Sequence, residues 1–168
     1  RGLGDVYKRQ VPEHVPAYNR IRGFEDTCKE HHIPYELMLQ DLGYTYETTY
    51  VAIRQVFQKI DSTYSGKKKG VFLSNDTYAN IFLNLLFQKY GKLPEDYQIV
   101  GFDNSPNANE AILPITTIGQ QIDKIAKTAM ELLILQMDEM KKRRPTPLEH
   151  PIHKQITPVL IRRETTDS

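Results

Sequence analysis

The sequence lacks the features of a disulfide-rich secreted domain, a membrane span or a nucleic-acid-binding surface. Cys28 is the only cysteine among 168 residues. A single thiol excludes an intrachain disulfide and favours a reducing compartment, so we expect a cytoplasmic protein. No apolar run approaches the roughly 20 residues that span a bilayer. The 22 basic and 21 acidic residues leave a formal net charge of +1, which gives no general field for binding nucleic acid.

The short motifs of common catalytic sites are also missing. The chain contains no phosphate-binding glycine loop of the GxGxxG or GxxxxGK[ST] type, no GxSxG turn and no recognisable pair of nucleophile and base. The histidine pairs at residues 31–32 and at 150 and 153 have no cysteine or carboxylate cluster at suitable spacing, so no metal site is predicted. The sequence therefore gives no positive support for an enzyme, and we expect no cofactor.

Apolar periodicity predicts strands that alternate with helices. Helices are expected at residues 20–32, 46–60, 77–90 and 122–140, and strands at residues 36–39, 71–73, 98–102 and 156–161. This alternation indicates an α/β layer with a doubly wound parallel sheet and right-handed crossovers. The chain is long enough to bury a core of ordinary size.

Polar residues follow three apolar runs between Gly70 and Gln120. Asn75 follows the run 71–73, Asp103 follows the run 99–102, and Gln120 closes the run PITTIG. In an open parallel sheet, ligands bind just beyond the carboxyl ends of the strands. An amide can donate to and accept from a hydroxyl group, and a carboxylate can accept from two adjacent hydroxyls. This stretch therefore predicts one wall of a cleft that binds a polyol.

The predicted helix 77–90 is apolar around most of its circumference. Its polar positions Asn80, Asn84 and Gln88 form a single narrow stripe. A helix of this kind usually packs on two sides. One side is expected to cover the sheet, and the other either meets a partner subunit or lies inside a large core.

Five sequence blocks together resemble the LacI/GalR transcriptional regulators, in their sugar-binding domain with a periplasmic-binding-protein-like fold. The blocks occur in the family's order and approximate spacing and span nearly all of residues 18–166: RIRGF at 20–24, SND at 74–76, LPEDYQIVGFDN at 93–104, PITTIGQ at 114–120 and VLIRRETT at 159–166. The resemblance implies that fold, mostly its C-terminal lobe, and a homodimer that pairs through helices of this lobe.

The resemblance also implies a fragment of a longer protein. Residues 1–10 (RGLGDVYKRQ) have no counterpart in the family and are interpreted as a non-native leader, and residues 11–168 as a partial effector-binding domain. The DNA-binding module would precede it, either a helix-turn-helix or the winged helix of arabinose-repressor-like hybrids, and would alone contact DNA. Expressed by itself, such a fragment should expose unpaired sheet edges and apolar helix faces.

The resemblance assigns ligand roles to Arg20 and to the strand-end residues. Arg20 matches the arginine of the family's RxxGF block, a ligand to sugar hydroxyls, although a solvated arginine on a first helical turn is the ordinary alternative. Asn75 and Asp103 are the other predicted ligands, with a turn or capping role as the alternative for Asp103. Gln120 either reaches the cleft or begins the following helix. Asp76 is predicted to cap the helix 77–90.

An aromatic platform is expected beside the ligand, because sugars pack their apolar faces against rings. Tyr44 and Tyr46 are the candidates, and each is equally compatible with a core or surface position. Phe102 is predicted to pack beneath the site as core.

The sequence thus predicts the sugar-sensing domain of a DNA-binding repressor. A small sugar, arabinose or another mono- or disaccharide, would bind between two lobes and shift the dimer between DNA-competent and DNA-incompetent arrangements. The alternative is a periplasmic or extracellular sugar-binding protein that feeds a transporter and shares the fold. The blocks LPEDYQIVGFDN and VLIRRETT favour the regulator.

Overall fold

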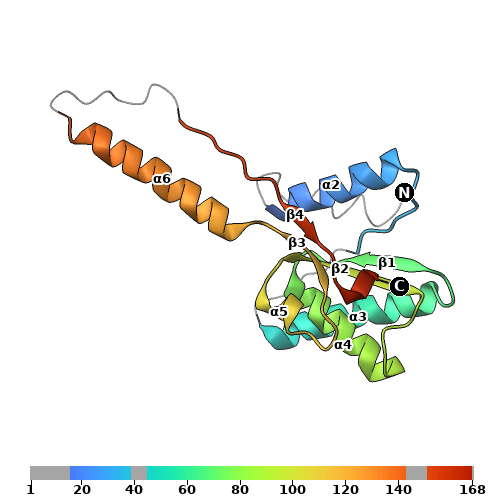
Figure 1. Ribbon diagram of the computed structural model, residues 1–168. Coiled ribbons are helices and arrows are strands. Elements are labelled where there is room, and N and C mark those ends of the chain that lie inside the picture. The colour runs from blue at the N-terminus through green and yellow to red at the C-terminus, as the bar shows by residue number, and fades with distance from the viewer. Residues whose placement is uncertain (1–15, 39–44, 143–150, 168) are drawn as a thin grey trace.

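A four-stranded sheet forms the centre of the structure, a computed structural model that describes residues 16–38, 45–142 and 151–167 (Figure 1). The strands lie in the order β1-β2-β3-β4, with bounds β1 Lys69–Phe72, β2 Tyr97–Asp103, β3 Thr116–Gly119 and β4 Val159–Ile161. The helices are α2 Pro16–Glu30, α3 Tyr46–Thr63, α4 Asp76–Tyr90, α5 Pro106–Asn109 and α6 Ile122–Met140, with the 3-10 turn η1 Glu164–Thr166. From β1 to β4 the predicted alternation of strands and helices is confirmed.

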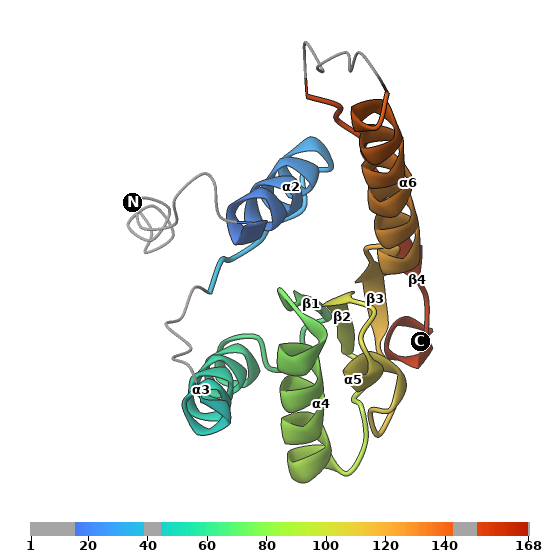
Figure 2. The same ribbon diagram turned by 90° about the vertical axis from the view of Figure 1, so that its left-hand side faces the viewer.

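The sheet is parallel except at its last strand. β1 pairs with β2 and β2 with β3 in parallel, whereas β3 and β4 are antiparallel. The prediction of a parallel sheet is therefore wrong for β4. The chain leaves β3 through α6, beyond the carboxyl edge of the sheet, and returns from the same side, as Figures 1 and 2 show. β4 consequently enters at that edge and runs in the opposite direction.

Threonine hydroxyls attach the end of the chain to the sheet. The fully buried Thr165 of η1 donates to the carbonyl of Ile99 at 2.7 Å and accepts from the amide of Thr116 at 2.9 Å. The Thr116 hydroxyl in turn donates to the carbonyl of Arg163 at 3.0 Å. The block VLIRRETT thus supplies a short edge strand and the turn that anchors it.

Local side-chain bonds set the ends of the central helices. Thr45 and Thr48 form a reciprocal capping box at the start of α3. Asn75 caps α4, because its side-chain oxygen accepts from the amide of Tyr78 at 2.9 Å. The predicted cap, Asp76, is instead the first helical residue. Gly91 ends α4 at φ 70°, a left-handed conformation that glycine adopts without strain.

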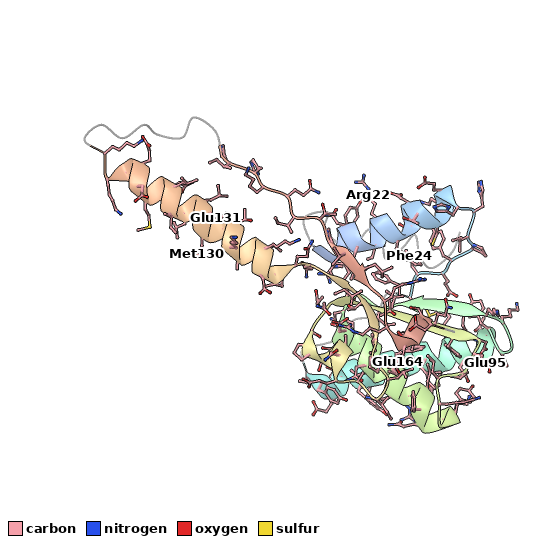
Figure 3. The ribbon with its side chains drawn as sticks, viewed as in Figure 1. Arg22, Phe24, Glu95, Met130, Glu131 and Glu164 are labelled. Carbon is pink, nitrogen blue, oxygen red and sulfur yellow. The ribbon has the colours of Figure 1, made fainter. Side chains whose placement is uncertain are left out.

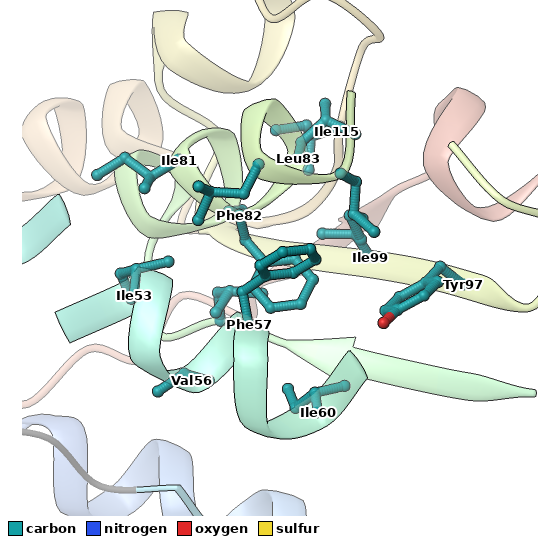
Figure 4. Close-up of a cluster of buried hydrophobic side chains, with 14 of the residues drawn as sticks. Ile53, Val56, Phe57, Ile60, Ile81, Phe82, Leu83, Tyr97, Ile99 and Ile115 are labelled. Carbon is teal, nitrogen blue, oxygen red and sulfur yellow. The ribbon is translucent and has the colours of Figure 1, made fainter. Parts of the chain in front are cut away.

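The hydrophobic core lies between α3, α4 and the sheet (Figure 4). Phe82 of α4 is fully buried and meets Phe57 of α3 edge to face, with ring centroids 5.6 Å apart. On its other side α4 packs against β2, where Ile99 and Tyr97 are buried. Two alternatives were predicted for the second side of α4: a partner subunit or the interior of a large core. The structure shows the second, because α3 covers that side.

The first part of the chain departs from prediction. Residues 36–38 of the predicted strand 36–39 form no strand, and Leu39 lies outside the described residues. A strand needs a neighbour to satisfy its backbone groups, whereas Glu36 is held through its side chain, which accepts from Lys59 at 2.5 Å and Tyr64 at 2.7 Å. This segment is tied to α3 and not to the sheet.

α6 has the predicted bounds and projects away from the sheet (Figures 1 and 2). None of its residues is buried, although Ile125, Leu133 and Leu135 belong to it. Figure 3 shows its side chains, including Met130 and Glu131, extending from the helix on open sides. Within the described part of the chain, no helix is long and apolar enough to cross a membrane.

Candidate functional site

The carboxyl ends of β1, β2 and β3 lie at one edge of the sheet, because these three strands are parallel. β2 ends at Asp103, whose register partner is Gly119 at the end of β3. Gln120 follows Gly119 directly, and Ser74 and Asn75 follow β1. The sheet therefore brings three of the four predicted polar ligands to the same edge, as expected from the sequence.

Helix α2 brings the fourth, Arg20, to this edge. Its guanidinium donates to the carbonyl of Ser74 at 2.7 Å and lies over the ring of Phe102, 3.9 Å from the centroid. A second guanidinium nitrogen lies 3.6 Å from a carboxylate oxygen of Asp103. Phe24, on the side of α2 that faces the sheet in Figure 3, stacks on Phe72 with centroids 5.9 Å apart. Stacking and charge together position Arg20.

Asp103 is the centre of the site. Besides the contact with Arg20, its carboxylate accepts from the Gln120 amide at 2.6 Å. The backbone has a positive φ at Asp103, 106°, and at Asn104, 54°. Residues other than glycine rarely adopt a positive φ, and this backbone conformation costs of order 1 to 3 kcal/mol per residue. The positive φ takes Asp103 out of the regular alternation of β2, and surrounding contacts must maintain it.

Arg20, Asp103 and Gln120, here named the strand-end cluster, form a polar group able to bind hydroxyls. The side chains of Arg20 and Asp103 are 23% and 36% exposed, so both are reachable from solvent. Asp103 accepts hydrogen bonds, Arg20 donates them, and Gln120 can do both. A compound with adjacent hydroxyl groups could replace the contacts within the cluster by contacts to itself. The phenyl ring of Phe102 lies directly below the guanidinium.

The remaining predicted ligands are placed differently. Asn75 lies at the same edge, but its side-chain oxygen caps α4, which leaves the amide nitrogen outside that bond. Tyr46 begins α3, is 62% exposed, and has the ring of Tyr50 as its stacking neighbour at 6.4 Å. The structure thus does not bring Tyr46 to the strand-end cluster. Tyr44 lies outside the described residues.

Phe102 packs beneath the site, as predicted, because its ring lies under the Arg20 guanidinium, but it is not a core residue. Along β2, Tyr97, Ile99 and Gly101 are buried, while Val100 and Phe102 are only half-buried. Because side chains alternate along a strand, Phe102 shares a face with Gln98 and not with the core residue Ile99. The alternation of β2 could have assigned it to the outer face from the sequence.

Asp76 has a different role from the predicted cap. Its side chain is 1% exposed and accepts from the hydroxyl of Thr117 at 2.5 Å and from the amide of Ser105 at 2.7 Å. It lies against Gly101, where an added Cβ would meet the Asp76 carboxylate and stand 3.3 Å from the Ala79 Cβ. The glycine of VGFDN is thus required by the close approach of α4 to β2.

A hollow at the opposite end of the sheet is lined mainly by charged residues, two of which form an ion pair. It lies at the amino ends of β1 and β2 and is lined by residues 68–70, 95, 96 and 98. Lys69 pairs there with Asp96 and lies 4.1 Å from the centroid of the Tyr97 ring. These contacts give Lys69 and Asp96 a role within the fold, and the strand-end cluster is kept as the candidate site.

Sequence comparison places nearly the whole chain in one family. A family model described as a periplasmic binding protein-like domain matches residues 3–166. The predicted periplasmic-binding-protein-like α/β fold is confirmed by this match.

Individual relatives are transcriptional regulators. The ribose operon repressor of Bacillus subtilis is 26% identical over 124 residues, which cover 73% of this chain and 36% of the repressor. The HTH-type transcriptional repressor PurR of Vibrio vulnificus is 29% identical over 124 residues, 73% of this chain and 35% of PurR. The chain therefore spans about a third of the length of these curated relatives.

A solved structure of similar fold contains a bound sugar. It is a LacI family transcriptional regulator from Enterococcus faecium with bound ribose, 26% identical to this chain, with a TM-score of 0.66. The alignment covers 92% of this chain and 54% of the regulator. The resemblance to LacI/GalR regulators, predicted from five short blocks, is confirmed.

Proposed function

Because the chain belongs to the family of periplasmic binding protein-like domains, we propose that it forms part of the effector-binding domain of a LacI/GalR-type transcriptional repressor. The relatives that match it are repressors and regulators, which favours this function over the transport protein that was the alternative. The same relatives argue against an enzyme. A cytoplasmic location follows from this proposal.

The strand-end cluster carries the proposal for a small sugar as effector. It combines a carboxylate acceptor, a guanidinium donor and an amide at the carboxyl edge of three parallel strands. Adjacent hydroxyls of a sugar match a carboxylate flanked by donors, since each hydroxyl can donate to Asp103 and accept from Arg20 or Gln120. The bound ribose of the Enterococcus faecium regulator supports this ligand class.

Binding would alter DNA affinity by favouring one arrangement of the protein over another. A ligand shifts such an equilibrium only by its differential affinity, commonly about 1 to 3 kcal/mol in allosteric proteins. Arg20 belongs to α2, whereas Asp103 belongs to the sheet, so a sugar held by both would link these two elements. DNA contacts would come from residues outside this chain, in a homodimer.

Asp103→Asn in the full-length protein tests the assignment. The change keeps the size of the side chain but removes the charge that makes its hydrogen bonds strong, so sugar affinity should fall roughly 10- to 100-fold. Isothermal titration calorimetry with D-ribose, L-arabinose and a panel of hexoses and disaccharides measures it. Asp26→Asn is the matched control, because Asp26 lies on the exposed surface of α2. Unchanged sugar affinity in Asp103→Asn would refute the assignment.

A DNA-binding measurement separates a regulator from other sugar-binding proteins. The sugar identified by calorimetry should change the affinity of the full-length protein for a DNA fragment from its own upstream region, measured by fluorescence anisotropy. Asp103→Asn should lose this response while still binding the DNA. A sugar that binds without any effect on DNA affinity would contradict the regulator, and chemical turnover of the sugar would favour an enzyme instead.

A further inference from the structure

Asp76 is a buried carboxylate that the strand-end cluster does not include. Its side chain is 1% exposed, and both of its oxygens accept hydrogen bonds. Burial of a charged group is costly unless partners compensate it. Its partners are the amide of Ser105, which belongs to the segment that follows β2, and the hydroxyl of Thr117 on β3. The carboxylate thus joins three separate segments of the chain.

Thr117 extends this connection to a second backbone amide. The Thr117 hydroxyl donates to Asp76 at 2.5 Å and accepts from the amide of Asn104 at 3.3 Å. Thr117 is fully buried and is the register partner of Gly101, so its hydroxyl lies on the side of the sheet that faces α4. Asp76 therefore holds Ser105 directly and Asn104 through Thr117.

These two amides follow Asp103 directly. Asp103 and Asn104 both have a positive φ, a conformation that persists only where neighbouring contacts impose it. The side chain of Asn104 is held separately, because it accepts from the guanidinium of Arg163 at 2.7 Å. The side-chain oxygens of Asp76 and Thr117 thus hold the two backbone amides immediately beyond Asp103.

We propose that Asp76, acting through Thr117 and Ser105, is a positioning residue that aims the Asp103 carboxylate at the sugar. The proposal rests on the function proposed above, since it explains how the fold presents that carboxylate. Asp76 itself is enclosed, with 1% of its surface exposed, so its role would be indirect. Loss of the connection should release Asp103 from its positive φ and weaken sugar binding, with the sheet and its core left in place.

Thr117→Val is the least disruptive test, because it keeps the shape of the side chain and replaces the hydroxyl with a methyl group. Thr116→Val is the matched control. Thr116 is the preceding residue of β3 and is also buried, but its hydroxyl faces Arg163 and Thr166 instead of Asp76. Thr117→Ser keeps the hydroxyl and should restore the parental behaviour. Asp76→Asn, which leaves an amide nitrogen facing one of the two donors, is a second disrupting variant should Thr117→Val fold poorly.

Hydrogen exchange followed by NMR in the full-length protein gives a readout that needs no ligand. Relative to the amide of Leu83 in the core, the amides of Asn104 and Ser105 should exchange roughly tenfold faster in Thr117→Val. They should not do so in Thr116→Val, because the Thr116 hydroxyl bonds to the backbone of Arg163 and to Thr166, and to neither of these two amides. Equal acceleration in both variants, or none in either, would overturn the proposal.

Calorimetry with D-ribose gives the functional readout. Affinity should fall roughly tenfold in Thr117→Val and stay near the parental value in Thr116→Val and Thr117→Ser. Unchanged affinity in Thr117→Val together with faster exchange would show that Asp76 stabilises the loop without aiming Asp103, and would overturn the positioning role. A parental protein that binds no sugar would refute the proposed function instead, and the exchange result would then decide the role of Asp76 alone.

Discussion

Helices α4 and α6 are both rich in apolar residues, but α4 is buried in the core and α6 is exposed. Both are long and carry many apolar residues. α4 buries Ala79, Ile81, Phe82, Leu83, Leu85 and Leu86, whereas no residue of α6 is buried. Apolar periodicity predicts that a face exists, but whether another element covers that face depends on where the chain runs next.

The topology explains this difference. α4 follows β1 and packs back along the sheet, so β2 lies on one side of it and α3 on the other. α6 follows β3 but leads away beyond the carboxyl edge, and the chain returns only at β4 (Figure 2). Apolar area stabilises a fold only when it leaves water. α4 therefore contributes to the stability of this chain through its packing, and α6 contributes little.

Replacing one leucine in each helix by alanine should give the largest difference. Leu83 is fully buried in α4, and Leu135 is 64% exposed in α6. Leu83→Ala should destabilise the chain by about 2 to 5 kcal/mol, through lost burial and a residual cavity. Leu135→Ala should change the free energy of unfolding by less than about 0.5 kcal/mol, as for an ordinary surface position. Urea unfolding followed by circular dichroism measures both.

The same two variants, Leu83→Ala and Leu135→Ala, also test whether α6 stays exposed in a longer protein. If other residues bury Leu135 there, Leu135→Ala should cost more in the longer protein than in the 168-residue chain, while the cost of Leu83→Ala stays the same. A large cost of Leu135→Ala in the 168-residue chain itself would contradict the exposed position of α6.

A methyl group added between α4 and β2 should have the next largest effect. A Cβ at Gly101 would stand against the Asp76 carboxylate and 3.3 Å from the Cβ of Ala79, with little freedom for either to move. Gly101→Ala should therefore destabilise by about 1 to 3 kcal/mol, the usual cost of overpacking. A Cβ at Gly70 would meet nothing within 4 Å. Gly70→Ala is the matched control in β1 and should change stability by less than about 1 kcal/mol, also in urea unfolding.

The sequence was sufficient for the site wherever a residue's role follows from its place at a strand end. Asp103 and Gln120 come together because parallel strands end at one edge. Arg20 depended on the family resemblance, since nothing in its own surroundings predicts a partner 83 residues further along the chain. Its ion pair with Asp103 is a tertiary contact.

Asp76 was predicted from the sequence as the cap of α4, whereas the structure shows its neighbour Asn75 in that role. Both can cap a helix, and the choice depends on which side chain the sheet buries. Asp76 of α4 is buried because Gly101 of β2 leaves room for it and Thr117 of β3 supplies a donor. The direction of β4 and the strand predicted at residues 36–39 were wrong for the same reason. Strand pairing depends on neighbouring segments that the local sequence does not specify.

The last prediction compares the pH response of an ion pair that joins α4 to α3 with that of an ion pair on the surface of α6. Asp61 of α3 accepts from Tyr90 at 2.5 Å and Tyr97 at 3.0 Å and pairs with Lys89. Burial by itself would raise the pKa of Asp61, but the hydrogen bonds from Lys89, Tyr90 and Tyr97 outweigh it and lower that pKa. Such a group stabilises the fold above its unfolded pKa, and this contribution is lost as pH falls through the folded value.

Asp61→Asn should therefore destabilise by about 1 kcal/mol near neutral pH, and the difference from the parental chain should shrink below about pH 4. Asp138→Asn in α6 is the control, because Asp138 is 63% exposed and pairs with Lys141 on the helix surface. Exposed pairs of this kind contribute little, so urea unfolding of this variant should follow the parental curve at every pH. A pH-independent effect of Asp61→Asn would show that its hydrogen bonds, and not its charge, hold the end of α4 to α3.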